Sequence, residues 1–185
     1  MTEWIVVPTQ IFRADCDIVL DAIADPQAEA EAGLRLSKPY YSAGVALAVP
    51  RRSAVTGFSD LDGHTKVGVL VGSLAAWVLD QRHVPTSTYG FEEDMLEALA
   101  AGEIEAAAVS PLSAGYYNLT HPSRSFSILQ PSEAEQALVW NEAVGMRQPD
   151  DKLRAAIDAA LDRLSADGTI ARTYAKYGIS LAPPR

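Results

Sequence analysis

Short apolar runs alternate with longer amphipathic segments along most of this chain. Runs rich in valine, isoleucine, leucine and alanine, bounded by glycine, proline or aspartate, predict β-strands. These predicted strands cover residues 4–7, 17–23, 44–49, 66–71, 106–109, 126–129 and 137–146. Helical segments separate several of the strands, so the pattern predicts an α/β fold with a largely parallel sheet.

Helical periodicity is clearest near the C-terminus, where aliphatic residues recur on one helical face. This stripe consists of Leu153, Ile157, Leu161 and Leu164. Gly168 ends the segment, and a second short helix is predicted over residues 169–176.

Polar residues mark the starts of two further helices. Residues 92–101 begin with three acidic side chains and are followed by Gly102, which predicts a helix with a glycine stop. Ser73 is expected to cap the helix that follows it, because its hydroxyl can accept a hydrogen bond from a first-turn backbone N–H. Residues 111–118 are compatible with either a turn or a short helix.

Charge and cysteine content narrow the classes of function. The net charge of −9 argues against a nucleic-acid groove, which requires clustered lysine and arginine. The single cysteine, Cys16, cannot form an internal disulfide bond, and the three histidines are too scattered to predict a metal site.

No apolar stretch approaches the length of a membrane span. The N-terminus lacks the features of a secretion signal, which by itself indicates a cytoplasmic protein or a start inside a longer one.

No catalytic motif stands out in the sequence. It contains neither a phosphate-binding glycine loop nor a nucleophile elbow nor a zinc-protease helix motif. Glu92, Glu93 and Asp94 are adjacent carboxylates, but neighbours on a helix point in different directions. They therefore predict a charged helix start rather than a catalytic pair. We expect a binding protein without catalytic residues, metal ligands or a cofactor.

The order of several short segments carries a further signal. The first are DIV at 17–19, LSKPYY at 36–41, GVALAV at 44–49, FSDLDG at 58–63 and KVGV at 66–69. The later ones are GS at 72–73, EALAAGEIEAA at 97–107, YY at 116–117 and the run at 153–177. In this order they resemble the periplasmic amino-acid-type binding proteins of ABC importers, the bacterial extracellular solute-binding protein family 3.

The resemblance implies an α/β, two-lobed, periplasmic-binding-protein-like fold of type II. Residues 45–144 would form the second lobe, and residues 1–44 and 145–185 an incomplete first lobe. The family usually has further strand–helix units and a secretion signal before the segment at 17–19. Their absence from this sequence suggests a natural short form, a fragment or a misassigned start. A periplasmic location is implied by the resemblance alone.

The resemblance also suggests where a ligand would bind. The cleft candidates are Gly72, Ser73, Ser110, Tyr41 and Tyr116. The sequence does not decide whether Tyr40, Tyr117 and Trp77 line the cleft or pack in the core. Family members that bind amino acids carry an arginine where this chain has Ala30 and an aspartate where it has Ser110. We therefore predict that the chain does not bind α-amino acids.

Two functions remain open at this point. One is the binding of another small molecule for an ABC importer, with the permease as protein partner. The other is an accessory role beside a quinoprotein (PQQ-dependent) methanol or alcohol dehydrogenase, because accessory proteins of that kind resemble this chain. An incomplete first lobe would expose apolar surface, which favours a protein partner or self-association into a homo-oligomer.

Overall fold

The computed structural model describes residues 17–25, 34–147 and 151–185. The strand predicted at residues 4–7, Cys16 and Ala30 lie outside these ranges. The chain divides into two compact units. Unit 1 comprises Met1–Ala43, Trp140–Ala175 and Ser180–Arg185, and unit 2 comprises Gly44–Val139 and Lys176–Ile179.

The sheet of unit 1 is built around β9 (Val139–Met146). β1 (Ile18–Ile23) and β2 (Arg35–Leu36) lie on either side of β9 and run antiparallel to it, and β3 (Tyr41–Gly44) also pairs with it. The strand predicted at 17–23 is confirmed. β2 and β3 were not predicted, because strands this short contain too few residues to show an alternating pattern.

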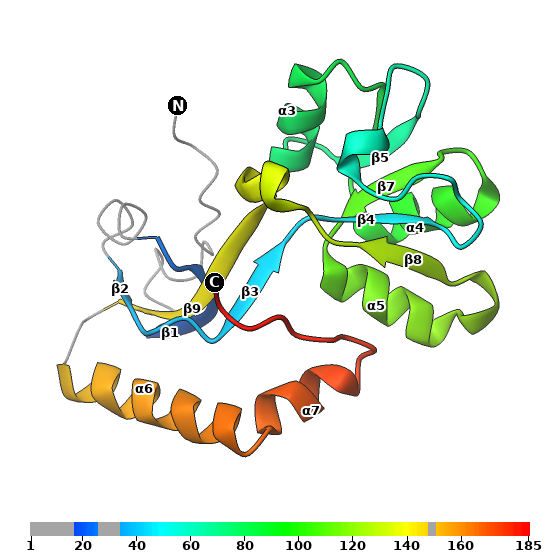
Figure 1. The fold of residues 1–185 in the computed structure, drawn as a ribbon. Coiled ribbons are helices and arrows are strands. Elements are labelled where there is room, and N and C mark those ends of the chain that lie inside the picture. Colours follow the sequence, from blue (N-terminus) through cyan, green and yellow to red (C-terminus); the bar gives the residue numbers. More distant parts are fainter. Residues whose placement is uncertain (1–16, 26–33, 148–150) are drawn as a thin grey trace. The chain divides into compact units, whose positions relative to one another are not determined.

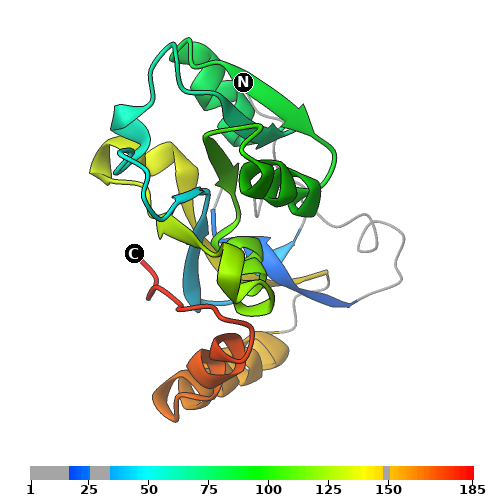
Figure 2. The ribbon, with the colours of Figure 1, turned by 90° about the vertical axis from the view of Figure 1, so that its right-hand side faces the viewer.

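Two helices, α6 (Asp151–Ala166) and α7 (Thr169–Ala175), follow each other on one face of this sheet (Figure 1 and Figure 2). They confirm the two C-terminal helices predicted from the sequence. Leu153 and Leu164 are each 39% exposed, so the apolar stripe of α6 is covered only in part. Amphipathic helices usually bury such a stripe.

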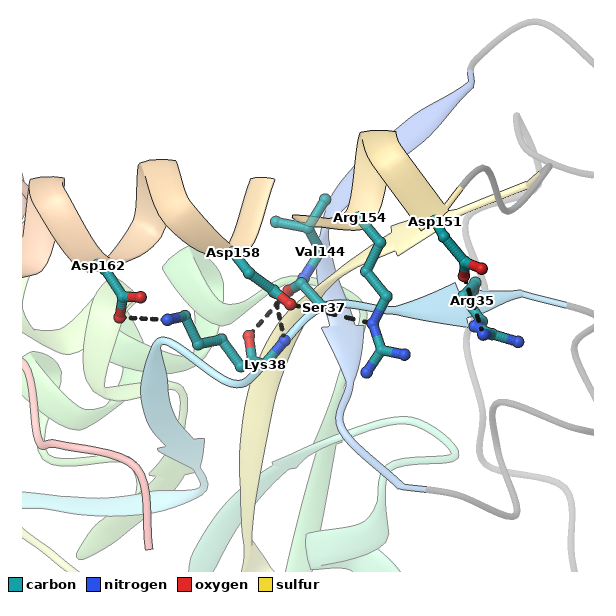
Figure 3. A network of polar contacts seen from close by, with 8 residues as sticks. All are labelled: Arg35, Ser37, Lys38, Val144, Asp151, Arg154, Asp158 and Asp162. Carbon is teal, nitrogen blue, oxygen red and sulfur yellow. Dashed lines mark hydrogen bonds and ion pairs between the residues drawn. The ribbon is translucent and has the colours of Figure 1, made fainter. Parts of the chain in front are cut away.

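Polar contacts attach α6 to the segment around β2 (Figure 3). The carboxylate of Asp158 accepts a hydrogen bond from the backbone N–H of Lys38 at 2.9 Å, and the Lys38 ammonium pairs with Asp162. Arg35 and Asp151 form a further ion pair at 3.4 Å. The acidic side of α6 therefore faces a basic segment of its own unit.

Unit 2 contains a five-stranded sheet in the order β6-β5-β7-β4-β8. Its strands are β4 (Ala46–Pro50), β5 (Val67–Leu70), β6 (Thr86–Tyr89), β7 (Ala106–Val109) and β8 (Phe126–Leu129). β5 is parallel to β6 and β7, whereas β4 is antiparallel to β7 and β8. The expectation of a largely parallel sheet is therefore wrong, in this unit and around β9. A strand such as β4, which follows another strand without a helix between them, need not be parallel to its neighbours.

Helices cover both faces of the unit 2 sheet. They are α3 (Leu74–Gln81), α4 (Glu92–Ala101) and α5 (Pro111–Thr120). Leu47 and Val49 of β4 share a core cluster with Leu79 of α3, while Ala48 shares another with Met95 of α4 and Tyr117 of α5. Because neighbouring residues of a strand point to opposite faces, β4 is buried on both sides. This explains its continuous apolar sequence.

Three short 3₁₀ turns complete unit 2. They are η1 (Phe58–Asp60), η2 (Pro122–Arg124) and η3 (Glu133–Leu138). A strand was predicted at 137–146, but its first two residues belong to η3, and the strand β9 begins at Val139. A capping box explains the difference, because Ser132 and Glu135 satisfy each other's backbone N–H groups and begin a helical turn there. Across the described ranges, no helix has both the length and the apolar character needed to cross a membrane.

Candidate functional site

One edge of the unit 2 sheet gathers the carboxyl ends of three parallel strands. β5 pairs in register with β6, Leu70 opposite Tyr89, and with β7, Val67 opposite Ala106. A helix begins shortly after each strand ends. In open α/β sheets, ligands bind outside the carboxyl ends of the strands. We call residues 71–73, 90–92 and 110 the carboxyl edge.

Gly72 and Ser73 form the turn from β5 into α3. Gly72 has a positive φ of 68°, a conformation that glycine adopts without strain. The hydroxyl oxygen of Ser73 accepts a hydrogen bond from the backbone N–H of Ala76 at 3.2 Å, which confirms the predicted cap. Because this bond uses the oxygen as an acceptor, the hydroxyl proton remains available to a ligand acceptor.

Ser110 and Glu92 meet at the start of α5. The hydroxyl of Ser110 caps α5 by accepting a hydrogen bond from Leu112 N at 3.2 Å. Its backbone N–H donates to Oε1 of Glu92 at 2.7 Å. Glu92 is the first residue of α4, and the cap of that helix, Phe91, makes no side-chain hydrogen bond. The Glu92 carboxylate therefore lies against the neighbouring helix start.

The role of Glu92 was missed by sequence reasoning, which assigned it only to a charged helix start. The alternation of strands and helices carries the signal that could have found it. α4 and α5 both begin at the edge where parallel strands end, so a carboxylate at the start of one can reach the first N–H groups of the other.

Exposed apolar side chains accompany these polar groups. Val71 is 70% exposed and Phe91 73% exposed at the carboxyl edge. Tyr116 and Trp77, farther along α5 and α3, are about half exposed, and the Tyr116 ring lies 6.3 Å from that of Tyr177. Large exposed apolar residues near polar groups are typical of ligand or partner surfaces. Trp77 is therefore not a fully buried core residue.

Tyr41, the remaining site candidate, belongs to unit 1. Its ring is buried, 4.9 Å from that of Tyr40 and 5.5 Å from that of Tyr174. Burial raises the pKa of both the Tyr40 and Tyr41 phenols, and the Tyr40 hydroxyl donates a hydrogen bond to the carbonyl oxygen of Leu20 at 2.6 Å. Tyr117 is a packing residue of unit 2, since its buried ring stacks on Phe126.

A buried carboxyl group in unit 1 was also missed. Glu142 of β9 is 7% exposed, and its Oε1 accepts a hydrogen bond from Trp140 Nε1 at 2.7 Å. Its Oε2 is buried and has no hydrogen-bond partner among the described residues. Burial raises the pKa of this carboxyl group, and the nearby charge of Asp21 raises it further. Glu142 is therefore a costly place for a negative charge.

Metal ligands were not expected, and the described part of the chain contains no cluster of three or more His, Cys, Asp or Glu residues that could hold an ion. The structure thus brings Gly72, Ser73 and Ser110 to one sheet edge and adds Glu92 to them. The site candidates that it describes are hydroxyl groups, one carboxylate and exposed apolar surface. That set is suited to binding a polar small molecule.

Comparison with known proteins supplies the context for this edge. Residues 5–180 match the profile of the family described as bacterial extracellular solute-binding proteins, family 3. The histidine-binding periplasmic protein of Escherichia coli (strain K12) is 26% identical over 143 residues, which is 74% of this chain and 55% of that protein. The chain thus spans about half the length of the curated relatives it matches.

Solved structures show the same fold. An ancestral cationic amino acid solute-binding protein, AncCDT-1, superposes with a TM-score of 0.77 at 20% identity, over 96% of this chain and 76% of that one. The L-cystine solute receptor of Neisseria gonorrhoeae, in its unliganded open conformation, gives a TM-score of 0.77 at 17% identity, over 100% of this chain and 76% of the receptor. At these identities the likeness establishes the type II two-lobed architecture and not a ligand.

Proposed function

Because the chain belongs to the bacterial extracellular solute-binding proteins, family 3, we propose that it binds a small solute other than an α-amino acid. It would deliver that solute to the permease of an ABC importer from the periplasm. In this proposal unit 2 corresponds to the second lobe of the family fold, and unit 1 belongs to the first lobe. The carboxyl edge of unit 2 would provide one side of the binding site.

The proposed ligand class rests mainly on Ser110. It stands where the resemblance places an aspartate for the ammonium of an amino acid, and its hydroxyl is used as a helix cap. Ala30 stands where the resemblance places an arginine for the carboxylate. Truncating one partner of a buried charge pair costs about 2–5 kcal/mol. Losing both contacts would remove most of the affinity for a zwitterion.

Binding without catalysis fits the groups at the carboxyl edge. Ser73 and Ser110 are the hydroxyl groups there, and both accept hydrogen bonds from backbone N–H groups of their own helices. Within the described ranges, no histidine or lysine is hydrogen-bonded to either of them. A nucleophilic serine needs such a base within hydrogen-bond reach. The described residues offer nothing that favours the alternative role beside a quinoprotein dehydrogenase.

Titration calorimetry with the twenty amino acids tests the proposed ligand class. We expect no binding tighter than about 1 mM, since the two missing contacts together are worth several kcal/mol. The histidine-binding protein of Escherichia coli, titrated with histidine under the same conditions, is the matched control. A micromolar dissociation constant for any amino acid would contradict the ligand class that we propose.

A further inference from the structure

Residues 176–185, which we call the C-terminal strap, belong first to unit 2 and then to unit 1. Lys176–Ile179 form part of unit 2, and Ser180–Arg185 form part of unit 1. The chain also passes between the units after Ala43 and after Val139, in the segments of β3 and β9. We propose that the strap is a conformational device that couples a contact with α5 in unit 2 to contacts with β3 and β9 in unit 1. This inference goes beyond the proposed function, since it involves no solute.

In unit 2 the strap is anchored by a close contact between two glycines. A Cβ atom at Gly115 of α5 would lie 2.8 Å from the carbonyl oxygen of Gly178, and a Cβ atom at Gly178 would lie 2.6 Å from the carbonyl oxygen of Gly115. Gly178 also has a φ of 75°, which glycine adopts without strain. Side-chain atoms of Ile179 and Leu119 lie beside the contact. The backbones of the strap and of α5 therefore pack directly together, and this contact is the unit 2 anchor.

In unit 1 the strap is anchored by hydrogen bonds to β3 and β9 (Figure 1, strap in red). The backbone N–H of Ser42 in β3 donates to the carbonyl oxygen of Ala182 at 3.0 Å, in an antiparallel bridge. The side chain of Asn141 in β9 donates from Nδ2 to the carbonyl oxygen of Arg185 and accepts at Oδ1 from Arg185 N, each at 3.0 Å. Ser42 and Asn141 lie within two residues of the points where the chain passes to unit 2. These bonds are the unit 1 anchor.

The linker between the two anchors is short. It consists of Ser180 and Leu181, which span roughly 10 Å at full extension and allow the anchors little independent movement. An anchor that is bound holds the other close to its own partner and so raises its effective concentration there. Coupling of this kind is reciprocal, so loosening either anchor should loosen the other. When bound, the strap restricts β3 and β9 near the points where they lead to unit 2, and its release gives these strands more freedom.

The alternative is that the two anchors open independently, as separate local contacts do. Gly115→Ala acts on the unit 2 anchor, because its methyl group collides with the carbonyl oxygen of Gly178, while alanine is the better helix former and keeps α5 intact. Asn141→Ala acts on the unit 1 anchor, because it removes both hydrogen bonds to Arg185. Gly63→Ala is the matched control, since a Cβ atom there meets no atom within 4 Å.

Two measurements on the full chain report the two anchors. Hydrogen exchange of the Ser42 N–H reports the unit 1 anchor, and the rate of tryptic cleavage after Lys176, followed by mass spectrometry, reports the unit 2 anchor. We expect Gly115→Ala to accelerate both at least about 10-fold, because the clash favours the released strap. Asn141→Ala should accelerate both at least about 3-fold through the lost hydrogen bonds. Gly63→Ala should change neither rate by more than about 2-fold.

An effect confined to the substituted anchor, in either variant, would overturn the inference, because the anchors would then open independently. The same holds if Gly115→Ala changes neither rate. If circular dichroism shows that Gly115→Ala does not fold, Asn141→Ala decides alone, and an unchanged rate of cleavage after Lys176 would contradict the coupling. Neither measurement involves a solute, so a failure here leaves the proposed function untouched.

Discussion

Replacing Gly44 with alanine is expected to lower the free energy of unfolding of unit 2 by about 2–3 kcal/mol. A Cβ atom at this position would collide with the carbonyl oxygen of Leu138 and lie 3.2 Å from Cα of Val139. Both are backbone atoms, which cannot move aside as a flexible side chain can. The Leu138 carbonyl is also held by a hydrogen bond from Val45 N at 2.9 Å, so a shift would weaken that bond.

Urea unfolding measures this loss, and Gly63→Ala is its matched control. A Cβ atom at Gly63 would meet no atom within 4 Å, and its φ lies outside the left-handed region. The control should therefore change the free energy of unfolding by less than about 0.5 kcal/mol. Equal effects of the two substitutions would mean that the close approach of Gly44 and Leu138 does not constrain the fold.

Glu142→Gln is expected to stabilise unit 1 by about 1–2 kcal/mol at pH 8 and by much less at pH 5. Burial, with the charge of Asp21, raises the pKa of the Glu142 carboxyl above its ordinary value of 4.5. A raised pKa means that the folded state binds the proton more tightly than the unfolded state. The stabilising effect of that proton is fully present below pH 4.5 and is lost as the pH rises through the folded pKa.

Glutamine keeps the Oε1 acceptor for Trp140 Nε1 and cannot ionise, so the variant escapes this loss. Urea unfolding followed by tryptophan fluorescence, which includes Trp140 of unit 1, would measure both proteins at the two pH values. Glu133→Gln, at an exposed position of η3, is the control and should leave the pH dependence unchanged. A difference between Glu142→Gln and wild type that does not grow with pH would show that Glu142 is not a buried acid.

Local signals in the sequence predicted the first and last residues of several elements correctly. The helix at 92–101 and the strand at 106–109 match α4 and β7, because an acidic first turn, a glycine stop and a short apolar run are properties of neighbouring residues. Gly102 confirms the stop with a φ of 77°. The Ser73 cap was predictable for the same reason.

Elements that depend on distant partners were not predictable in this way. β6 has the polar sequence TSTY and forms an edge strand, so only its pairing with β5 identifies it. The direction of β4 likewise depends on which strands it meets. In the site, the hydrogen bond between Glu92 and Ser110 joins residues 18 positions apart, and it becomes visible only when the strand order is known.

Native mass spectrometry of the gently purified protein tests the central claim most directly, because it reports bound small molecules and oligomeric state in one spectrum. The solute-binding account predicts a monomer that carries one small-molecule adduct per chain, with a mass that fits no α-amino acid. A dimer or larger assembly without any adduct would contradict it. That result would indicate that the exposed apolar surfaces serve contacts between proteins rather than a solute.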